Sequence, residues 1–198
     1  MTAVVTPVGE ADVRLEVPEG APTALLLLGH GAGGGVDSAD LAEVAAAALA
    51  AGYAVARVTQ PYRVAGRRSP PRAPVLDEAW LAVAGQVHVD GLPLVVGGRS
   101  SGARVACRTA DQVGAVAVVA LAFPTAPPRT PEKDRLAELA APSVPVLVVQ
   151  GERDPFGIPP EAPGRTVTVL HGATHTIRGP AAHAAGVAVT TWLKAVLA

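Results

Sequence analysis

A strand, a sharp turn and a helix are encoded in the stretch Leu94-Val95-Val96-Gly97-Gly98-Arg99-Ser100-Ser101-Gly102-Ala103-Arg104-Val105-Ala106. An apolar run ends at two glycines, a serine follows, and helix-forming residues begin at once. The centre of the stretch matches G-x-S-x-G, the pattern of a strand-to-helix turn that exposes a nucleophilic serine. Glycine stands two residues to either side of Ser100 because strand and helix pass too closely there for larger side chains. Short motifs also arise by chance, and Ser100 would then be a plain helix cap, so the interpretation needs support from the rest of the chain.

Composition limits the class of protein. A length of 198 residues favours one domain, residues 1–198, and 49% hydrophobic against 17% charged residues indicates a globular core. The net charge of −1 gives no strong field for nucleic acid or membrane, so we expect neither partner. A single cysteine, Cys107, excludes an internal disulfide and fits a reducing compartment. The acidic start with Glu10 and Asp12 is not a signal peptide. We therefore expect a cytoplasmic protein.

Strand-like and helix-like segments alternate along the chain. An edge hairpin or short strands are expected within residues 2–19, buried strands at 24–28 and 115–121, and further strands at 53–58, 93–97, 145–150 and 166–170. Helices are expected from a cap at Asp37 or Ser38 to Gly52, at residues 75–87, 101–110 and 132–140, and from Pro180 onward. Residues 60–74 and 123–131 are expected to be loops. This order predicts an α/β fold with a mostly parallel central sheet and helices on both faces.

Three more candidate segments follow predicted strands, as Ser100 does. They are the glycine-rich loop His30–Gly35, Asp154 and His175. In parallel sheets, binding and catalytic sites form at the carboxyl ends of the strands, so these segments are expected to meet at one edge. The chain order serine, aspartate, histidine differs from the orders of the chymotrypsin and subtilisin types and fits an elbow-type hydrolase.

Each candidate has a role that the chemistry requires. The Ser100 hydroxyl needs a base to take its proton, and His175 is predicted as that base. Asp154 is predicted to orient the imidazole and stabilise its charged form. The backbone N–H of Ser101, at a helix N-terminus, is predicted as one oxyanion donor. The glycine-rich loop is predicted to supply the second donor, with Ala32 the first choice and Gly31 the next.

Several alternatives stay open at this point. Asp154 could serve only a turn with Pro155, in which case Glu152 and Glu161 are the fallback acids. His171 is the rival base four residues before His175. Among the other histidines, His30 is expected to be a structural hydrogen-bonder, His183 a helix-surface residue, and His88 a residue on the wrong side of the sheet. No metal-ligand spacing and no Walker motif occur, so we expect no metal and no cofactor.

The sequence resembles small α/β-hydrolases of the dienelactone-hydrolase-like group. Within that group it is most similar to the domain named after a testis-expressed protein and a subunit of a chromatin acetyltransferase complex. The resemblance is carried by Leu28-Gly29-His30-Gly31-Ala32-Gly33-Gly34, Gln60-Pro61-Tyr62-Arg63, Gly97-Gly98-Arg99-Ser100-Ser101-Gly102, Gln150-Gly151-Glu152-Arg153-Asp154-Pro155-Phe156-Gly157 and Gly172-Ala173-Thr174-His175. It departs where the family more often has Met-Gly-Gly in place of Ser101-Gly102-Ala103. The resemblance implies Ser100, Asp154 and His175 as a catalytic triad, and it implies no particular substrate.

The segment at residues 122–131, where many α/β-hydrolases insert a lid, is too short for a cap domain. We therefore expect an open, shallow site that favours small or polar carboxylic esters or thioesters as substrates. Tyr62, Arg63 and Phe156 are candidate substrate-binding residues. The arginines of loop 63–72 could recognise an anionic substrate, but a solvated loop is the favoured interpretation. The alternatives to a hydrolase are a non-catalytic interaction module of the same fold and an acyltransferase. The oligomeric state is left open.

Overall fold

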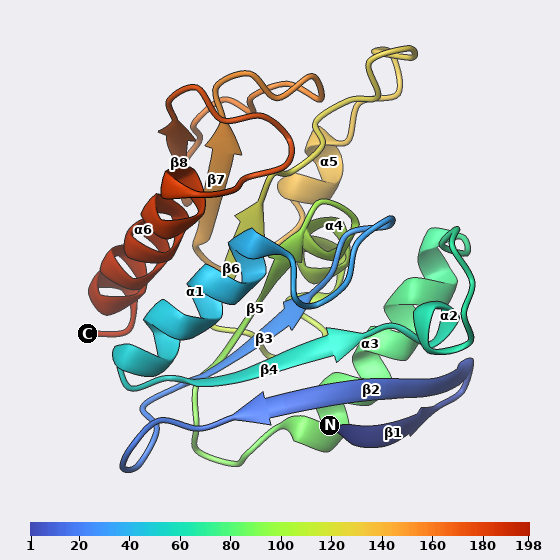
Figure 1. Ribbon diagram of the computed structural model, residues 1–198, viewed down its shortest axis with the longest axis vertical. Helices are drawn as coiled ribbons and strands as arrows, with labels where there is room; N and C mark the ends of the chain where they lie inside the picture. The colour runs from blue at the N-terminus through green and yellow to red at the C-terminus, as the bar shows by residue number, and fades with distance from the viewer.

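An eight-stranded sheet organises the computed structural model, which describes residues 1–198 (Figure 1). Its strands, in chain order, are β1 (Thr2–Thr6), β2 (Gly9–Glu16), β3 (Leu25–Gly29), β4 (Ala54–Thr59), β5 (Leu94–Arg99), β6 (Ala117–Leu121), β7 (Val146–Gly151) and β8 (Arg165–Leu170). The spatial order is β1-β2-β4-β3-β5-β6-β7-β8. The β1–β2 hairpin joins β4 in antiparallel fashion, and every pair from β4 to β8 is parallel. The predicted mostly parallel sheet is confirmed.

Helices cover both faces of the sheet (Figure 1). They are α1 (Ala39–Ala50), α2 (Pro61–Val64), α3 (Ala73–Val87), α4 (Ser101–Thr109), α5 (Leu136–Leu139) and α6 (Pro180–Val196). Helices α1 and α6 pack on one face, while α3, α4 and α5 pack on the other. No helix combines the length and the apolar composition that crossing a bilayer requires.

The two-residue period of the strands distributes their side chains between two cores. In β3, Leu25 and Leu27 belong to the core under α3 and α4, whereas Leu26 and Leu28 belong to the core under α1 and α6. All four are buried, and full burial of such a side chain contributes about 2 kcal/mol. A strand buried on both faces therefore has a continuous apolar sequence, which explains why β3 shows no alternation.

Two segments differ from the sequence-based expectation. The expected loop at residues 60–74 contains the short helix α2, because Pro61 at its first position is already fixed in a helical φ, and Gly66 at φ 74° ends the turn. The expected helix at residues 132–140 is reduced to α5. There Asp134 Oδ1 accepts the Leu136 N–H at 3.1 Å, which starts the helix later than predicted.

The start of α1 also corrects an expectation. Ser38 occupies the N-cap position, but its side chain makes no capping hydrogen bond. Asp37 instead pairs with Arg14 and Arg57 at 2.9 Å and 3.1 Å. The carboxylate in the first turn that matters for the site is Asp40, which is 1% exposed.

Candidate active site

Ser100 stands at the sharp turn between β5 and α4. Its φ of 52° and ψ of −107° lie in a region that side chains other than glycine rarely adopt, at a cost of about 1–3 kcal/mol. The Ser100 N–H donates to the carbonyl of Leu121 on β6 at 2.9 Å, which fastens the turn to the neighbouring strand. A Cβ at Gly98 or at Gly102 would collide with the carbonyl oxygen of Gly29. The strand and helix therefore approach β3 so closely that only glycine fits at both positions.

A hydrogen-bonded chain links Ser100, His175 and Asp154. His175 Nε2 lies 3.0 Å from Ser100 Oγ, and His175 Nδ1 lies 2.9 Å from Asp154 Oδ2. The Asp154 side chain is fully buried, and that of His175 is 19% exposed. An ionised carboxylate only accepts, so Nδ1 carries the proton and Nε2 can accept the Ser100 hydroxyl proton. The geometry is that of a nucleophile with its base and an orienting acid.

Asp154 is held by two further donors. Its Oδ1 accepts the Phe156 N–H at 2.9 Å, and its Oδ2 also accepts Gln150 Nε2 at 2.8 Å. Gln150 lies at the end of β7 and is 0% exposed. It was not singled out from the sequence, although an amide that ends an apolar strand beside Gly151 is a visible signal of a buried polar contact. These bonds fix the carboxylate that faces His175.

The glycine-rich loop passes close to the serine. A Cβ built at Gly31 would lie 3.6 Å from Ser100 Cβ, so the loop backbone passes beside the nucleophile. The Ala32 carbonyl accepts the Tyr62 hydroxyl at 3.0 Å, which anchors the loop on α2. Ser101 begins α4, whose first backbone N–H groups have no partner within the helix. The predicted oxyanion donors Ser101, Ala32 and Gly31 therefore lie on the two segments that flank Ser100.

His30 has a structural role. Its Nε2 accepts the Gln60 N–H at 3.1 Å, so Nδ1 carries the proton and donates to the Gly31 carbonyl at 2.8 Å. Burial is the largest influence on the ring and lowers its pKa, which keeps the imidazole neutral. The ring lies between β4 and the glycine-rich loop and has no hydrogen bond with Ser100. The expectation of a structural hydrogen-bonder is met.

The rival acids and bases lie away from this chain of contacts. His171 is 91% exposed at its side chain and lies 3.0 Å from Glu152 Oε2. The Gly172 N–H donates to the same carboxylate and is the main reason that the pKa of Glu152 is lowered. Glu161 is exposed, and His183 is an exposed residue of α6 that faces Glu43. His88 ends α3, before β5, as expected.

Phe156 is the candidate substrate-binding residue nearest the histidine. Its ring centroid lies 4.4 Å from that of His175, in a tilted arrangement. Tyr62 is buried against His30, with 5.8 Å between ring centroids, and Arg63 is half-buried with its guanidinium near the Arg67 carbonyl. Phe156 can therefore shape the space beside the base, whereas Tyr62 supports the glycine-rich loop.

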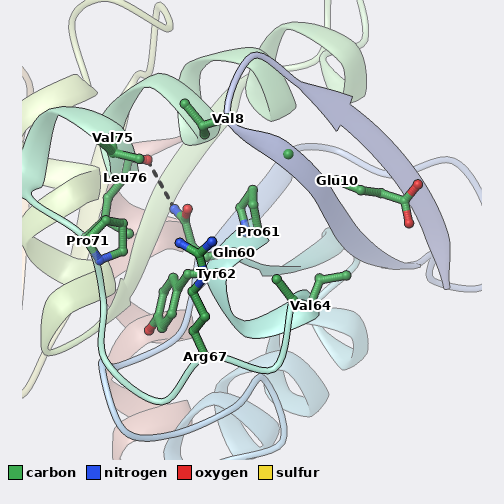
Figure 2. A pocket seen from close by; sticks show the side chains of 12 residues that line it. Val8, Glu10, Gln60, Pro61, Tyr62, Val64, Arg67, Pro71, Val75 and Leu76 are labelled. Atoms are coloured by element: carbon green, nitrogen blue, oxygen red, sulfur yellow. Dashed lines mark hydrogen bonds between the residues drawn. The ribbon is translucent and has the colours of Figure 1, made fainter.

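The cavity drawn in Figure 2 lies beside the site, between α2, α3 and the start of β2. It has a volume of about 220 Å³. Gln60 points into it and donates to the Leu76 carbonyl at 3.2 Å, and Arg67 extends along its wall. None of the five principal cavities has Ser100 or His175 in its wall. Ser100 itself is half-buried. No group of three or more His, Cys, Asp or Glu side chains is arranged to hold a metal ion.

A mostly parallel sheet with a strained serine elbow after its central strand defines the α/β-hydrolase fold. A family model described as an alpha/beta hydrolase domain matches residues 22–179, and the chain belongs to this family. A search of curated protein sequences finds no match.

Solved structures share the fold. An α/β serine hydrolase homologue from Coxiella burnetii is 19% identical, with 100% of this chain and 96% of that chain covered and a TM-score of 0.75. An α/β serine hydrolase without a lid from Xanthomonas campestris is 19% identical, with coverage of 99% and 92% and a TM-score of 0.76. Dienelactone hydrolase from Anabaena variabilis is 19% identical, with coverage of 98% and 95% and a TM-score of 0.77. At this identity the likeness concerns the fold alone.

Proposed function

We propose that this protein is a serine hydrolase that cleaves small or polar carboxylic esters or thioesters through an acyl-enzyme on Ser100. The observation that carries the proposal is the hydrogen-bonded chain from Ser100 Oγ through His175 to the buried Asp154. Family membership supports hydrolytic chemistry, and the structurally similar protein from Xanthomonas campestris is a serine hydrolase without a lid.

The proposed reaction follows from the position of each group. As Ser100 Oγ attacks the substrate carbonyl carbon, His175 Nε2 takes the hydroxyl proton, and Asp154 stabilises the resulting imidazolium. The backbone N–H groups of Ser101 and of Ala32 or Gly31 donate to the oxyanion of the tetrahedral intermediate. The intermediate collapses, His175 returns the proton to the leaving alcohol or thiol, and an ester between the acyl group and Ser100 remains. His175 then takes a proton from a water molecule that attacks this ester, and returns the proton to Ser100 Oγ as the bond to the acyl carbon breaks, which releases the acid and restores the free serine.

The shape of the site supports the substrate class. The connection after β6 forms no cap domain: it runs from the buried Ala122 through proline-rich turns to the four-residue helix α5. No principal cavity encloses Ser100, so a long acyl chain has no apolar tunnel to enter. Short acyl groups need no such enclosure and fit an open surface.

A fluorophosphonate probe tests the proposal directly, because it phosphonylates only an activated serine. We expect the wild-type protein to be labelled and Ser100→Ala to remain unlabelled. Ser143→Ala is a matched control, because Ser143 is an exposed serine whose hydroxyl bonds to Asp111. A wild-type protein that is never labelled would leave the non-catalytic interaction module as the function.

A series of p-nitrophenyl esters tests the substrate class. We expect kcat/KM to be highest for the shortest acyl chains and to fall as the chain lengthens. Faster hydrolysis of long-chain esters would contradict the proposal. Transfer of the acyl group to an added alcohol in preference to water would identify an acyltransferase instead.

A further inference from the structure

Arg99, the residue before the nucleophile, contacts the segment of the base and the glycine-rich loop. It ends β5, and its side chain is only 12% exposed. Its Nη2 donates to the backbone carbonyl of His175 at 2.9 Å. Its Nε lies 2.9 Å from Asp40 Oδ2 at the start of α1. Its Nη1 lies so close to Gly31 that a Cβ there would be 2.7 Å away.

The contact with His175 matters because residues 171–179 contain no helix or strand. The Ala173 carbonyl accepts the Arg153 N–H at 2.8 Å, which holds the beginning of this segment. At His175 itself, the imidazole is held by Asp154, while the carbonyl has Arg99 as its hydrogen-bond partner. Arg99 therefore fixes the backbone from which the base projects.

The ion pair with Asp40 explains how the charged Arg99 side chain can be buried beside the site. Asp40 is 1% exposed, so its carboxylate and the Arg99 guanidinium neutralise each other away from water. The contact is a close ion pair without the alignment of a hydrogen bond, because neither Nε nor Oδ2 has a hydrogen-bond partner. The planar fork of arginine leaves Nη1 and Nη2 free to face the glycine-rich loop and the histidine segment.

The geometry points to Arg99 as a positioning residue that sets the distance between Ser100 and His175 and holds the glycine-rich loop beside them. This inference rests on the proposed function. Arg99 is adjacent to the nucleophile in the chain, bonds the base through its backbone, and supports the loop of the proposed oxyanion donors at Gly31. One side chain thus connects the end of β5 to the glycine-rich loop at Gly31 and to His175, which lies 76 residues after Arg99.

Arg99→Met tests the role, because it keeps an unbranched apolar stem in the buried position and removes every polar contact. We expect kcat for a short-chain ester to fall about 100-fold with KM nearly unchanged, as a small misplacement of catalytic groups does. Arg99→Lys keeps the charge beside Asp40 but lacks the fork that reaches His175, so we expect most of the loss to persist. If Arg99→Met does not fold, Arg99→Lys carries the test.

Arg108→Met is the matched control. Arg108 is also a poorly exposed, ion-paired arginine, at 17% side-chain exposure, but it lies on α4 and contacts Asp77 and Glu138. We expect this variant to lose stability and keep kcat. Added guanidinium, far below denaturing concentrations, is expected to restore part of kcat in Arg99→Ala and to leave the kcat of Arg108→Ala unchanged. Equal kcat losses in the two methionine variants, or unchanged kcat in Arg99→Met, would overturn the inference.

A spectroscopic measurement separates this inference from the proposed function. The Nδ1 proton that His175 shares with Asp154 is expected to give a far-downfield proton resonance in the wild-type protein and in Arg108→Met, and to lose it in Arg99→Met. Absence of hydrolysis in the wild-type protein, with this pattern intact, would refute the proposed function and keep the positioning role. Persistence of the resonance in a folded Arg99→Met variant would refute the positioning role itself.

Discussion

Two arginine ion-pair clusters flank the nucleophile elbow, and they differ in the number of partners. Arg99, before the elbow, has one carboxylate, that of Asp40, and one backbone carbonyl. Arg108, on the helix after the elbow, donates to Asp77 at 2.6 Å and 2.9 Å and to Glu138 at 3.0 Å. Glu138 in turn receives two bonds of 2.6 Å from Arg104.

This difference suits the two clusters to different roles: the Arg99–Asp40 pair positions site residues, and the Arg108 cluster stabilises the packing of α4 against α3 and α5. Around Arg108, four charged groups connect α3, α4 and α5, and the two central ones, Arg108 and Glu138, each have two partners of opposite charge. Around Arg99, the loss of Asp40 leaves a charge without a partner in a nearly dry site. The Arg108 cluster therefore tolerates change, whereas the Arg99–Asp40 pair transmits any change to His175 and the glycine-rich loop.

Removal of the acid from each cluster should give the largest contrast in stability. We expect Asp40→Asn to lower the free energy of unfolding by about 3–5 kcal/mol, because it strands a buried guanidinium. Glu138→Gln should cost about 1 kcal/mol, because Arg104 and Arg108 keep some contact with water, at 25% and 17% side-chain exposure, and Arg108 keeps Asp77. Urea unfolding of both variants measures the two costs. Equal losses would show that the number of partners is not what distinguishes the clusters.

The support of the glycine-rich loop also depends on His30, which must stay neutral to accept the Gln60 N–H. Burial lowers its pKa in the folded protein below the ordinary value of 6.5. Below that value the unfolded chain binds a proton that the folded protein excludes, so stability falls as the pH drops from about 6.5 toward the folded pKa. The slope approaches about 1.4 kcal/mol per pH unit.

Urea unfolding between about pH 7 and about pH 5 in the wild type and in His30→Gln measures this contribution as a difference in slope. We expect the variant to be less stable at neutral pH and to show the shallower loss on acidification. Identical slopes would mean that the ring takes up a proton in the folded state as easily as in the unfolded one.

At lower pH the Arg108 cluster should lose part of its contribution to stability, because its carboxylate Glu138 becomes protonated. Burial opposes ionisation of Glu138, but the hydrogen bonds and charges of Arg104 and Arg108 outweigh it and lower the pKa of the carboxyl. The stability from this shift is complete above the unfolded pKa, about 4.5, and is lost as the pH falls through the folded value. Partial exposure limits it to about 1 kcal/mol or less. Glu138→Gln should show a correspondingly flatter acid limb in the same urea measurements, and an equally steep one would contradict the pairing.

Cys107 gives the smallest effect and a direct report on α4. Burial raises the pKa of its thiol to about 12, so it does not form a thiolate in the folded protein. We expect a thiol reagent to modify Cys107 only when the helix detaches from the sheet. Arg108→Met should accelerate this modification by loosening α4, and Arg99→Met should change it less. Fast modification of the wild-type protein would contradict the buried position.

The fold and the candidate site were predictable to different depths. The continuous apolar runs and the glycines after them located the strand ends, which is why Ser100, Asp154 and His175 could be selected before their distances were known. The roles of Arg99 and Asp40 could not be predicted, because their contact depends on the placement of α1 over β5 by the strand order. Asp40 in the sequence is an ordinary acidic residue in a first helical turn, and nothing local shows that it is buried.

The hydrogen bond between His175 and Ser100 spans 75 residues of the chain, and its histidine follows the edge strand β8. The elbow therefore exists as soon as β3, β5 and β6 have paired, while the base arrives only after β7 and β8 have added to the sheet. During refolding, reaction of Ser100 with an active-site probe should rise with the last long-range pairing rather than with the collapse of the central strands. The reactivity of Ser100 would thus report when folding is complete, with no reporter group added to the chain.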